Sequence, residues 1–237
     1  MAETLQEYIS RTVFMWKSLP ESGGFQTNES LLKKIDADGR FKPFYGDTAI
    51  FGLPNHEIAR LGQLQNALYG SLGDVLAEKI PPEMFHLTLH DLLNSPLGMP
   101  AESEGVMRRV QSLFVEIPDD FPKEIHLRSV CLFSMVNTSI VMGYEPAEEA
   151  DCETLMRLYD WFQQIVPLAY PLTLHVTLAY FKPGCYDEQT LCSLRNFFEE
   201  HGRDAHPLTL KLSDLAYARF ADMRDYERYM RIKTDEI

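Results

Sequence analysis

The sequence predicts an α+β protein with two similar lobes. Segments with strand and helix patterns follow one another as strand, helix, strand, helix, and this order occurs twice in the 237 residues, with additional strands around it. Two of the predicted strands, one in each half, contain nearly the same five residues. No linker rich in glycine or serine joins the halves, so we expect the lobes to pack against each other.

We interpret residues 1–44 as an N-terminal helix and extension, and residues 45–237 as the two-lobed domain. Apolar residues near helical spacing predict a helix over residues 3–18. Glu3 and Glu7 stand where a secretory signal would carry positive charge, and no continuous apolar stretch follows them. We therefore expect this helix to stay on the protein.

Turn residues separate the other predicted elements. Asn55 caps the first long helix, Pro81 stops the chain before the next strand, and Asn137 marks a hairpin between two strands. Pro146 begins a helix, and Pro183 follows the strand that carries the second copy of the repeated pattern. The predicted strands cover residues 48–53, 84–90, 124–136, 138–144, 172–181, 207–219 and 225–233, and the predicted helices cover residues 55–78, 101–116, 146–166 and 187–201.

The composition argues against several classes of protein. Hydrophobic residues make up 45% and charged residues 24% of the chain, as in ordinary globular proteins. No segment approaches the roughly 20 consecutive apolar residues of a membrane span, so we expect no membrane partner. The formal net charge of −13 argues against a protein that coats long nucleic acids, because such proteins normally present a basic face.

The cysteines show neither a disulfide framework nor the spacing of metal ligands. None of them forms a C-x-x-C pair, and none stands at a zinc-like spacing from a histidine. We expect reduced thiols, a cytoplasmic location and no metal site. The cysteines concerned are Cys131, Cys152, Cys185 and Cys192.

The clearest chemical signal is a repeated His-x-Thr pattern. The first half contains Phe-His-Leu-Thr-Leu, and the second half contains Leu-His-Val-Thr-Leu. Because side chains alternate along a strand, His86 and Thr88 point to one face while the apolar residues between them point to the core. His175 and Thr177 share a face in the same way.

If an approximate twofold axis relates the lobes, these two strands face each other across a cleft. The cleft then holds two imidazoles and two hydroxyls, which provide an acid, a base and two hydrogen-bond donors. A small tetrahedral anion such as phosphate suits this set. One His-x-Thr on a strand is a weak signal, whereas two copies in phase are a much stronger one.

The paired motifs resemble those of the 2H phosphoesterase superfamily, which includes cyclic nucleotide phosphodiesterases and the LigT-like RNA 2′,3′-cyclic phosphodiesterases. The run Leu-His-Val-Thr-Leu-Ala-Tyr-Phe, residues 174–181, is especially similar to the second motif of that superfamily. Gly46-Asp47-Thr48 before a strand resembles an uncharacterised bacterial branch. The resemblance implies a bilobal fold with two antiparallel sheets around a central cleft, helices on the outside, and catalysis without a metal or another cofactor.

The residues and the resemblance together predict hydrolysis of a 2′,3′-cyclic phosphate or a related RNA or nucleotide phosphodiester. In this hypothesis one of His86 and His175 removes a proton from water, and the other protonates the leaving oxygen. Thr88 and Thr177 donate hydrogen bonds to the non-bridging oxygens. The expected substrate is a small nucleotide or one RNA terminus. The sequence does not identify the substrate, the histidine that acts as base, the position of the phosphate in the product, or the oligomeric state.

Four further residues are candidates for contacts with the substrate. His90 lies two positions beyond the first motif, on its predicted outer face, and Phe181 lies on the corresponding face of the second strand. Tyr45 and Phe51 fall on or beside a predicted strand, where an aromatic ring can stack on a base. For each aromatic ring, packing in the core is the favoured interpretation and stacking on a base is the alternative. For His90 the favoured interpretation is a strand end in solvent.

Three other functions are alternatives to this interpretation. A binding module would capture a nucleotide or an RNA end in the same cleft and release it unchanged, although binding alone does not need a poised acid and base. A metal-dependent hydrolase would need clustered carboxylates and histidines at ligand spacing, which the sequence lacks. A structural protein would carry the two motifs by accident, which their matching phase argues against.

Overall fold

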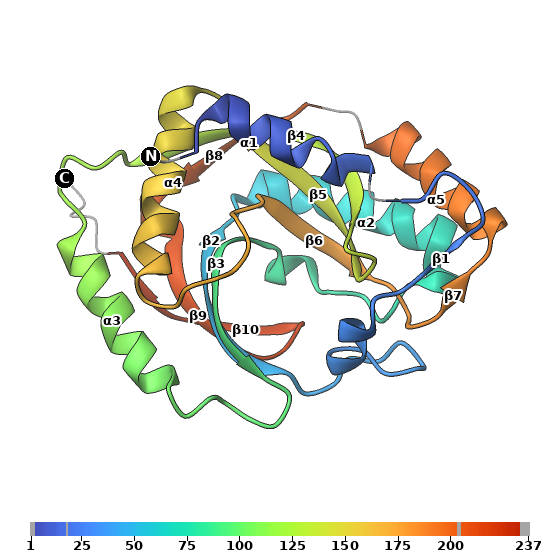
Figure 1. The fold of residues 1–237 in the computed structure, drawn as a ribbon, viewed down its shortest axis with the longest axis horizontal. Helices are drawn as coiled ribbons and strands as arrows, with labels where there is room; N and C mark the ends of the chain where they lie inside the picture. The colour runs from blue at the N-terminus through green and yellow to red at the C-terminus, as the bar shows by residue number, and fades with distance from the viewer. Residues whose placement is uncertain (1–2, 18, 203–204, 233–237) are drawn as a thin grey trace.

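The computed structural model describes residues 3–17, 19–202 and 205–232, and its core consists of two four-stranded antiparallel sheets (Figure 1). The first sheet has the order β10-β9-β2-β3, with β2 (Tyr45–Gly52), β3 (His86–Ser95), β9 (Leu215–Asp222) and β10 (Asp225–Arg231). The second has the order β6-β5-β4-β8, with β4 (Glu124–Met135), β5 (Ser139–Pro146), β6 (His175–Tyr180) and β8 (Pro207–Lys211). The predicted α+β class with two antiparallel sheets is confirmed.

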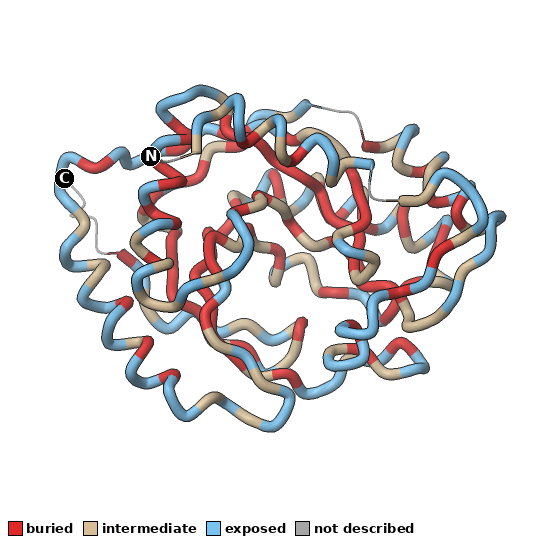
Figure 2. The backbone as a smooth tube through the Cα atoms, viewed as in Figure 1, coloured by how far each residue is buried: buried red, intermediate tan, exposed pale blue. Residues whose placement is uncertain are grey.

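Helices surround the sheets, and α3 and α5 lie at opposite ends of the molecule (Figure 1). The α-helices of the described chain are α1 (Leu5–Thr12), α2 (Asn55–Leu72), α3 (Ser103–Glu116), α4 (Glu149–Gln163) and α5 (Glu188–His201). None of the described helices is both long and apolar enough to cross a membrane. Figure 2 shows that the central strands are mostly buried, whereas α3 and α5 expose much of their outer surface.

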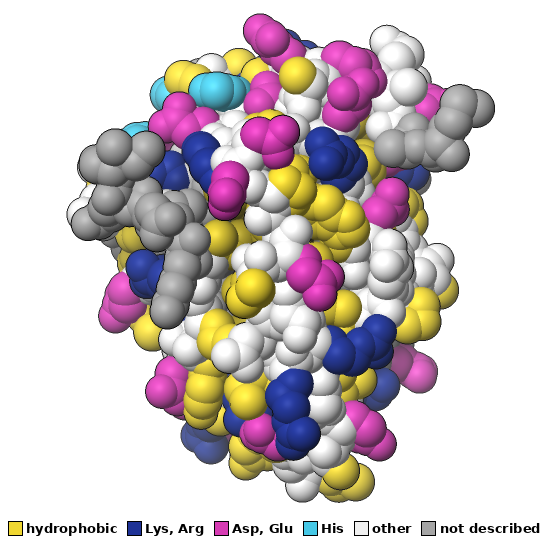
Figure 3. Space-filling view, turned by 90° about the vertical axis from the view of Figure 1, so that its left-hand side faces the viewer, with side chains coloured by type: hydrophobic (Ala, Val, Ile, Leu, Met, Phe, Trp, Pro, Cys, Tyr) yellow, Lys and Arg dark blue, Asp and Glu magenta, His cyan; other side chains and the backbone are white. Residues whose placement is uncertain are grey.

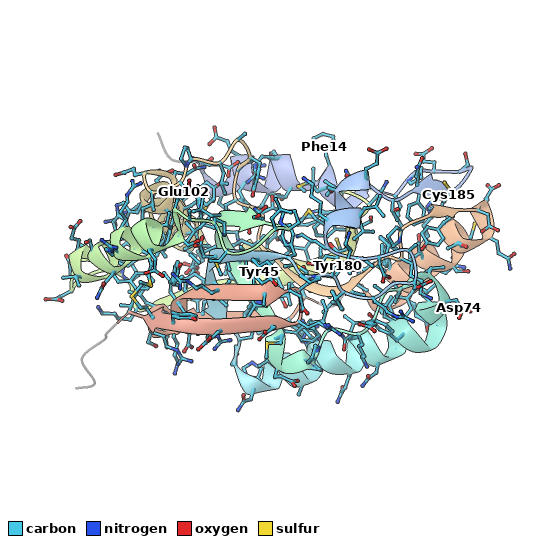
Figure 4. The ribbon with its side chains drawn as sticks, turned by 90° about the horizontal axis from the view of Figure 1, so that it is seen from below. Phe14, Tyr45, Asp74, Glu102, Tyr180 and Cys185 are labelled. Atoms are coloured by element: carbon cyan, nitrogen blue, oxygen red, sulfur yellow. The ribbon has the colours of Figure 1, made fainter. Side chains whose placement is uncertain are left out.

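The N-terminal segment packs on the second sheet. Helix α1 begins with a capping box in which the Thr4 side chain accepts a hydrogen bond from the backbone N–H of Glu7. Farther along, the short strand β1 (Phe25–Gln26) pairs with β7 (Cys185–Tyr186). Figure 4 shows the exposed side chain of Phe14 directed outward from this segment. The described parts of the N-terminal segment are therefore attached to the second half of the chain by helix packing and by a short β-ribbon.

Several predicted element boundaries are wrong. The helix predicted over residues 3–18 ends at Thr12, and the strand predicted over residues 84–90 extends to Ser95. The helix predicted over residues 55–78 ends at Leu72, because a 3₁₀ turn over residues 73–75 follows and the backbone N–H of Ala77 then donates to the carbonyl of Tyr180. The single strand predicted over residues 207–219 consists of two strands.

Strands β8 and β9 lie in different sheets, separated by a 3₁₀ turn at Leu212–Asp214. Leu212 is fully buried, and its backbone N–H donates to the carbonyl of Lys123. The chain turns there because the Leu215 N–H bonds back to the Leu212 carbonyl. Ser213 and Asp214 interrupt the alternation of apolar residues, which resumes at Leu215 one position out of phase. The prediction of a single strand passes over this local signal of the turn.

The sheets meet along their edge strands. Strand β3 is the last strand of the first sheet, and β6 is the last strand of the second. The two strands contact each other. On the inner face of β3, Leu87 and Leu89 are buried, and on β6 Val176 and Leu178 are buried. Because these residues face the core, the opposite face of each strand lies at the junction of the two sheets.

Candidate active site

The structure brings the two His-x-Thr motifs to one junction. His86 and Thr88 are partly exposed on β3, and His175 and Thr177 are partly exposed on β6. The charge of His175 is close enough to lower the pKa of His86. We call these four residues the two-histidine site. Its four polar groups come from the facing edges of two sheets, as the alternation in sequence predicts.

Both imidazoles are held in the same way. His86 Nδ1 lies 2.7 Å from the carbonyl oxygen of Met84, and His175 Nδ1 lies 2.8 Å from the carbonyl oxygen of Thr173. A carbonyl oxygen only accepts hydrogen bonds, so each Nδ1 carries the proton. Nε2 of each neutral ring is therefore unprotonated and is the atom that can accept a proton.

The groups needed for chemistry make no hydrogen bond within the described parts of the chain. Among the described residues, neither imidazole Nε2 and neither threonine hydroxyl of the two-histidine site makes a hydrogen bond. None of these four atoms is buried without a partner either, so they are open to solvent. Two proton-transfer groups and two hydroxyl donors are thus available to a bound molecule.

A β-bulge follows each motif at the equivalent residue. In the first sheet Ile50 pairs with Thr88 and Ala49 pairs with His90, so Leu89 is the extra residue. In the second sheet Val141 pairs with Thr177 and Ile140 pairs with Ala179, so Leu178 is the extra residue. The matching irregularity supports the idea that the lobes are two versions of one structural unit.

The bulges make two sequence predictions wrong. A bulge reverses the alternation of side chains beyond it. His90 therefore points into the core, where it is 1% exposed and packs against the rings of Tyr159 and Phe162. Phe181 is likewise fully buried, against Phe25 and Tyr186. Neither ring lies on the face of the two-histidine site.

The other two aromatic candidates also lie elsewhere. Phe51 is fully buried in the core, so its ring has no face available to a base. Tyr45 is partly exposed but pairs with Ser95, whereas His86 pairs with Gly52 at the opposite end of β2. The predicted substrate contacts of Phe51 and Tyr45 are therefore not supported by their positions.

Strand β10 supplies two neighbours of His86 that are not among the candidates from sequence. The Tyr226 ring lies 4.5 Å from the His86 ring, measured between centroids. A Cβ atom at Gly52 would lie 2.8 Å from Nη1 of Arg228, so this guanidinium rests on the residue that pairs with His86. Tyr226 and Arg228 are two positions apart on one strand. That spacing indicates that the two side chains share one face of the strand. Nothing in the local sequence indicates which other strand β10 lies beside.

The second motif has neighbours from the N-terminal segment. Gly143 pairs with His175, and a Cβ atom there would lie 2.6 Å from the Trp16 ring. The Lys34 ammonium group lies over the rings of Phe44 and Tyr180, and its charge lowers the pKa of His175. Figure 4 places Tyr180 near the middle of the molecule. No sequence motif marks Trp16 or Lys34 as part of this site.

One carboxylate also influences both histidines. Asp91 is exposed just beyond the first bulge, and its negative charge raises the pKa of His86 and of His175. Its Oδ2 accepts a hydrogen bond of 2.8 Å from the hydroxyl of Tyr170. Tyr170 lies between α4 and β6, so this bond joins the two halves beside the two-histidine site.

The net effect of the surroundings is to favour neutral imidazoles. The pKa of His86 is lowered from 6.5 to about 4, chiefly because burial disfavours the imidazolium form. The charges of Arg228 and His175 contribute to this lowering. Burial also lowers the pKa of His175, and Lys34 adds to the effect. Both rings are therefore available as proton acceptors near neutral pH.

One cavity lies away from the two-histidine site, between two helices. It has a volume of about 470 Å³ and lies between α3 and α4, where Arg109, Leu113, Trp161 and Ile165 line it. Arg109 donates a hydrogen bond of 2.7 Å to the carbonyl of Ile165 at its wall. Figure 3 views the molecule from this side and shows basic and acidic side chains interspersed with hydrophobic ones. Among the described residues, no group of three or more His, Cys, Asp or Glu side chains is placed to hold a metal ion.

Comparison with known proteins supports the fold. No family model and no curated protein matches the sequence. Among solved structures, ATU0111 from Agrobacterium tumefaciens, a conserved protein of unknown function, matches with a TM-score of 0.66 and 17% identity, over 88% of this chain and 94% of its own. TT0787 of Thermus thermophilus matches with a TM-score of 0.51 and 15% identity, over 80% of this chain and 99% of its own.

The similar structures also include E. coli LigT in its apo form, with a TM-score of 0.48 and 15% identity, over 79% of this chain and 96% of LigT. At such identities a structural match concerns the fold. The matches to ATU0111 and TT0787 extend over most of both chains in each case. The arrangement of two antiparallel sheets with outer helices is therefore one that this chain shares with solved bacterial proteins.

Proposed function

We propose that this protein hydrolyses a phosphodiester, with a 2′,3′-cyclic phosphate on a nucleotide or an RNA terminus as the expected substrate. The observation that carries the proposal is the convergence of two imidazoles, each with Nδ1 held by a carbonyl and Nε2 free, beside two free threonine hydroxyls. Binding alone would need donors, but it would not need two proton acceptors in matched orientation. The resemblance of both motifs to the 2H phosphoesterases supports the same function.

In the proposed reaction a water molecule attacks phosphorus. Nε2 of one histidine accepts the proton from that water as the new P–O bond forms. The bond from phosphorus to one ribose oxygen breaks, and the other histidine, in its protonated form, gives its proton to that oxygen. Thr88 and Thr177 donate hydrogen bonds to the non-bridging oxygens, where negative charge develops. The product is a phosphate monoester, and the step uses only groups of this chain.

Turnover of a 2′,3′-cyclic nucleotide tests this proposal. The purified protein should convert a mixture of 2′,3′-cyclic nucleotides to monophosphates, and the rate should be the same with and without EDTA. If the protein binds the cyclic nucleotides and releases them unchanged, it is a binding module. If activity disappears in EDTA and returns with a divalent cation, the two-histidine mechanism is wrong.

The pH dependence of kcat/KM should be displaced to acidic pH. The reaction needs one neutral and one protonated imidazole, so its optimum lies between the two pKa values. Burial lowers both values, and that of His86 is about 4. The productive form is therefore lost by double protonation at low pH and by double deprotonation as pH rises. We expect kcat/KM to be greatest below about pH 6.5, the ordinary histidine value.

A kcat/KM profile measured from pH 4 to 9 would check this expectation. An optimum near pH 8 would show that the free enzyme does not depend on a histidine with a lowered pKa. The same profile with His56→Ala is a control, because His56 is exposed at the start of α2 and belongs to neither motif.

Arg228 and Lys34 should attract the anionic substrate to the site. Neither side chain has a carboxylate partner among the described residues, although the protein has a net charge of −13. We expect Arg228→Met and Lys34→Met each to raise KM about tenfold, or about 1.4 kcal/mol, with a smaller change in kcat. The effect should shrink at high salt because mobile ions screen these charges.

Arg157→Met provides a charge-matched control for these variants. Arg157 is exposed on α4, over the rings of Phe121 and Trp161, and it is not near either motif. Its replacement removes one positive charge but should leave KM unchanged. If all three variants change KM equally, overall charge and not local binding explains the effect.

A further inference from the structure

We infer that helix α1 is a positioning element for His175, acting through the backbone of residues 172–174. The effect on turnover rests on the proposed function, but the effect on the imidazole does not. The inference gives a role to part of the N-terminal segment, which carries neither motif. It concerns Tyr8 and Arg11, two side chains on the face of α1 that meets the second sheet.

The orientation of His175 depends on a backbone carbonyl outside strand β6. The carbonyl oxygen of Thr173 accepts the proton of His175 Nδ1 at 2.8 Å. Thr173 precedes β6 and lies in no helix or strand. If this carbonyl turned away, the ring would lose the bond that keeps Nε2 unprotonated and fixes its direction.

Tyr8 holds one end of this segment from inside the protein. The backbone N–H of Leu174 donates to the Tyr8 hydroxyl at 2.9 Å, and the hydroxyl donates to the carbonyl of Tyr144 at 3.1 Å. In the other direction, the Tyr144 N–H donates to the carbonyl of Leu174. The hydroxyl therefore lies between the strands where a direct backbone bond would otherwise form. Tyr8 is fully buried, so water does not replace it readily.

Arg11 holds the other end of the segment. Its Nη2 donates to the carbonyl of Leu172 at 2.7 Å, and its Nη1 donates to the Thr173 hydroxyl at 3.3 Å. The same guanidinium is fixed by Glu3, with Nε 2.8 Å from Oε1 and Nη2 2.9 Å from Oε2. A planar donor held by a carboxylate on one side has little freedom to move on the other. Residues 172–174 are thus bonded to α1 at each position.

The orientation of His86 in the first motif does not depend on a distant helix in this way. His86 Nδ1 donates to the carbonyl of Met84, which belongs to a 3₁₀ turn at Pro82–Met84. That turn is closed by its own backbone, since the Met84 N–H donates to Pro81 and the Phe85 N–H donates to Pro82. Two adjacent prolines restrict the backbone further. The carbonyl that accepts the Nδ1 proton is therefore held by its own turn at His86. At His175 it is held by a helix that is distant in sequence.

This asymmetry provides an internal control for a test by NMR. Long-range ¹H–¹⁵N spectra of the imidazole rings distinguish the Nδ1–H tautomer from the Nε2–H tautomer. The wild-type protein should show Nδ1–H at both His86 and His175. Tyr8→Phe and Arg11→Met should each increase the Nε2–H form of His175 and leave His86 unchanged. Ser10→Ala, on the exposed side of α1, should change neither ring.

The same variants have a kinetic signature. We expect Tyr8→Phe and Arg11→Met to lower kcat about 10-fold, and at most about 100-fold, because a displacement near 1 Å is enough to cause such losses. KM should stay within about twofold, since neither side chain contacts the two-histidine site directly. Arg11→Lys keeps a donor for the Leu172 carbonyl and should recover part of the lost kcat. It also keeps the test available if Arg11→Met does not fold.

Two outcomes would overturn the inference. One is that His175 keeps its Nδ1–H tautomer in the folded Tyr8→Phe and Arg11→Met variants. The other is that His86 changes as much as His175, which would indicate a general disturbance. If the NMR result is as expected but wild-type protein hydrolyses no phosphodiester, the proposed function fails while the role of α1 in holding His175 stands.

Discussion

Replacement of either motif histidine by alanine should lower kcat by about 10² to 10⁴, because each imidazole performs one proton transfer. The loss should be similar for His86→Ala and His175→Ala, since an acid without a base is as ineffective as the reverse. The double variant should be only slightly slower than either single variant, because the two groups act together in one step. Steady-state rates on a 2′,3′-cyclic nucleotide would measure all three values.

Two comparisons separate catalysis from folding in this experiment. Both histidines are partly exposed, so their removal should leave the melting temperature close to that of the wild type. His56→Ala, which replaces an exposed histidine outside the motifs, should keep full activity. Wild-type rates in either motif variant would mean that the phosphodiester is cleaved elsewhere in the protein or not by this pair.

Removal of the motif hydroxyls should have the next largest effect. Thr88→Val and Thr177→Val keep the shape and the strand preference of the side chain but remove a hydrogen-bond donor. We expect each to lower kcat by about 10² to 10³, the usual loss for one donor to a developing charge. Thr88→Ser and Thr177→Ser keep the donor and should stay within about tenfold of the wild type on the same ground.

The hydrogen bonding of the site separates a catalytic role of the two threonine hydroxyls from a structural one. Neither threonine hydroxyl has a partner among the described residues, so neither is needed to hold the fold. A structural role would appear as a lower melting temperature in the valine variants, with the serine variants intermediate. A catalytic role would appear as a loss of kcat at an unchanged melting temperature. Equal activity of the valine and serine variants would remove the threonines from the mechanism.

The central part of the site could be predicted from sequence because it depends on local geometry. Side chains on a strand alternate, and buried leucines or valines on one face fix the other face. That rule places His86 with Thr88 and His175 with Thr177, as the structure shows. The rule of alternation fails immediately after each motif, because bulges at Leu89 and Leu178 reverse the alternation.

The bulges explain why two of the four secondary candidates, His90 and Phe181, do not belong to the site. The extra residue in each strand has no distinctive chemistry, since leucine is ordinary both in regular strands and at these positions. Strict alternation would place both side chains on the face of the motifs, whereas they point into the core. Residues 207–219 differ from this case, because Ser213 and Asp214 interrupt the apolar pattern at the turn between the two sheets.

The remaining parts of the site depend on contacts between distant segments. Arg228 comes from the last strand, and Lys34 and Tyr8 come from the N-terminal segment. Each lies near a histidine only because the chain folds back over the sheets, and no local pattern encodes that return. The sequence thus indicates the acid and the base. It does not indicate the residues that shift their pKa values, fix the orientation of their rings and surround them.

Titration with a nucleoside monophosphate product would show whether both imidazoles act on one phosphate. In ¹H–¹³C spectra, the Cε1–H signals of His86 and His175 should both shift, with one common dissociation constant, while the signal of His56 stays fixed. A shift of only one of the two motif histidines, or two different dissociation constants, would show that the imidazoles do not share one phosphate.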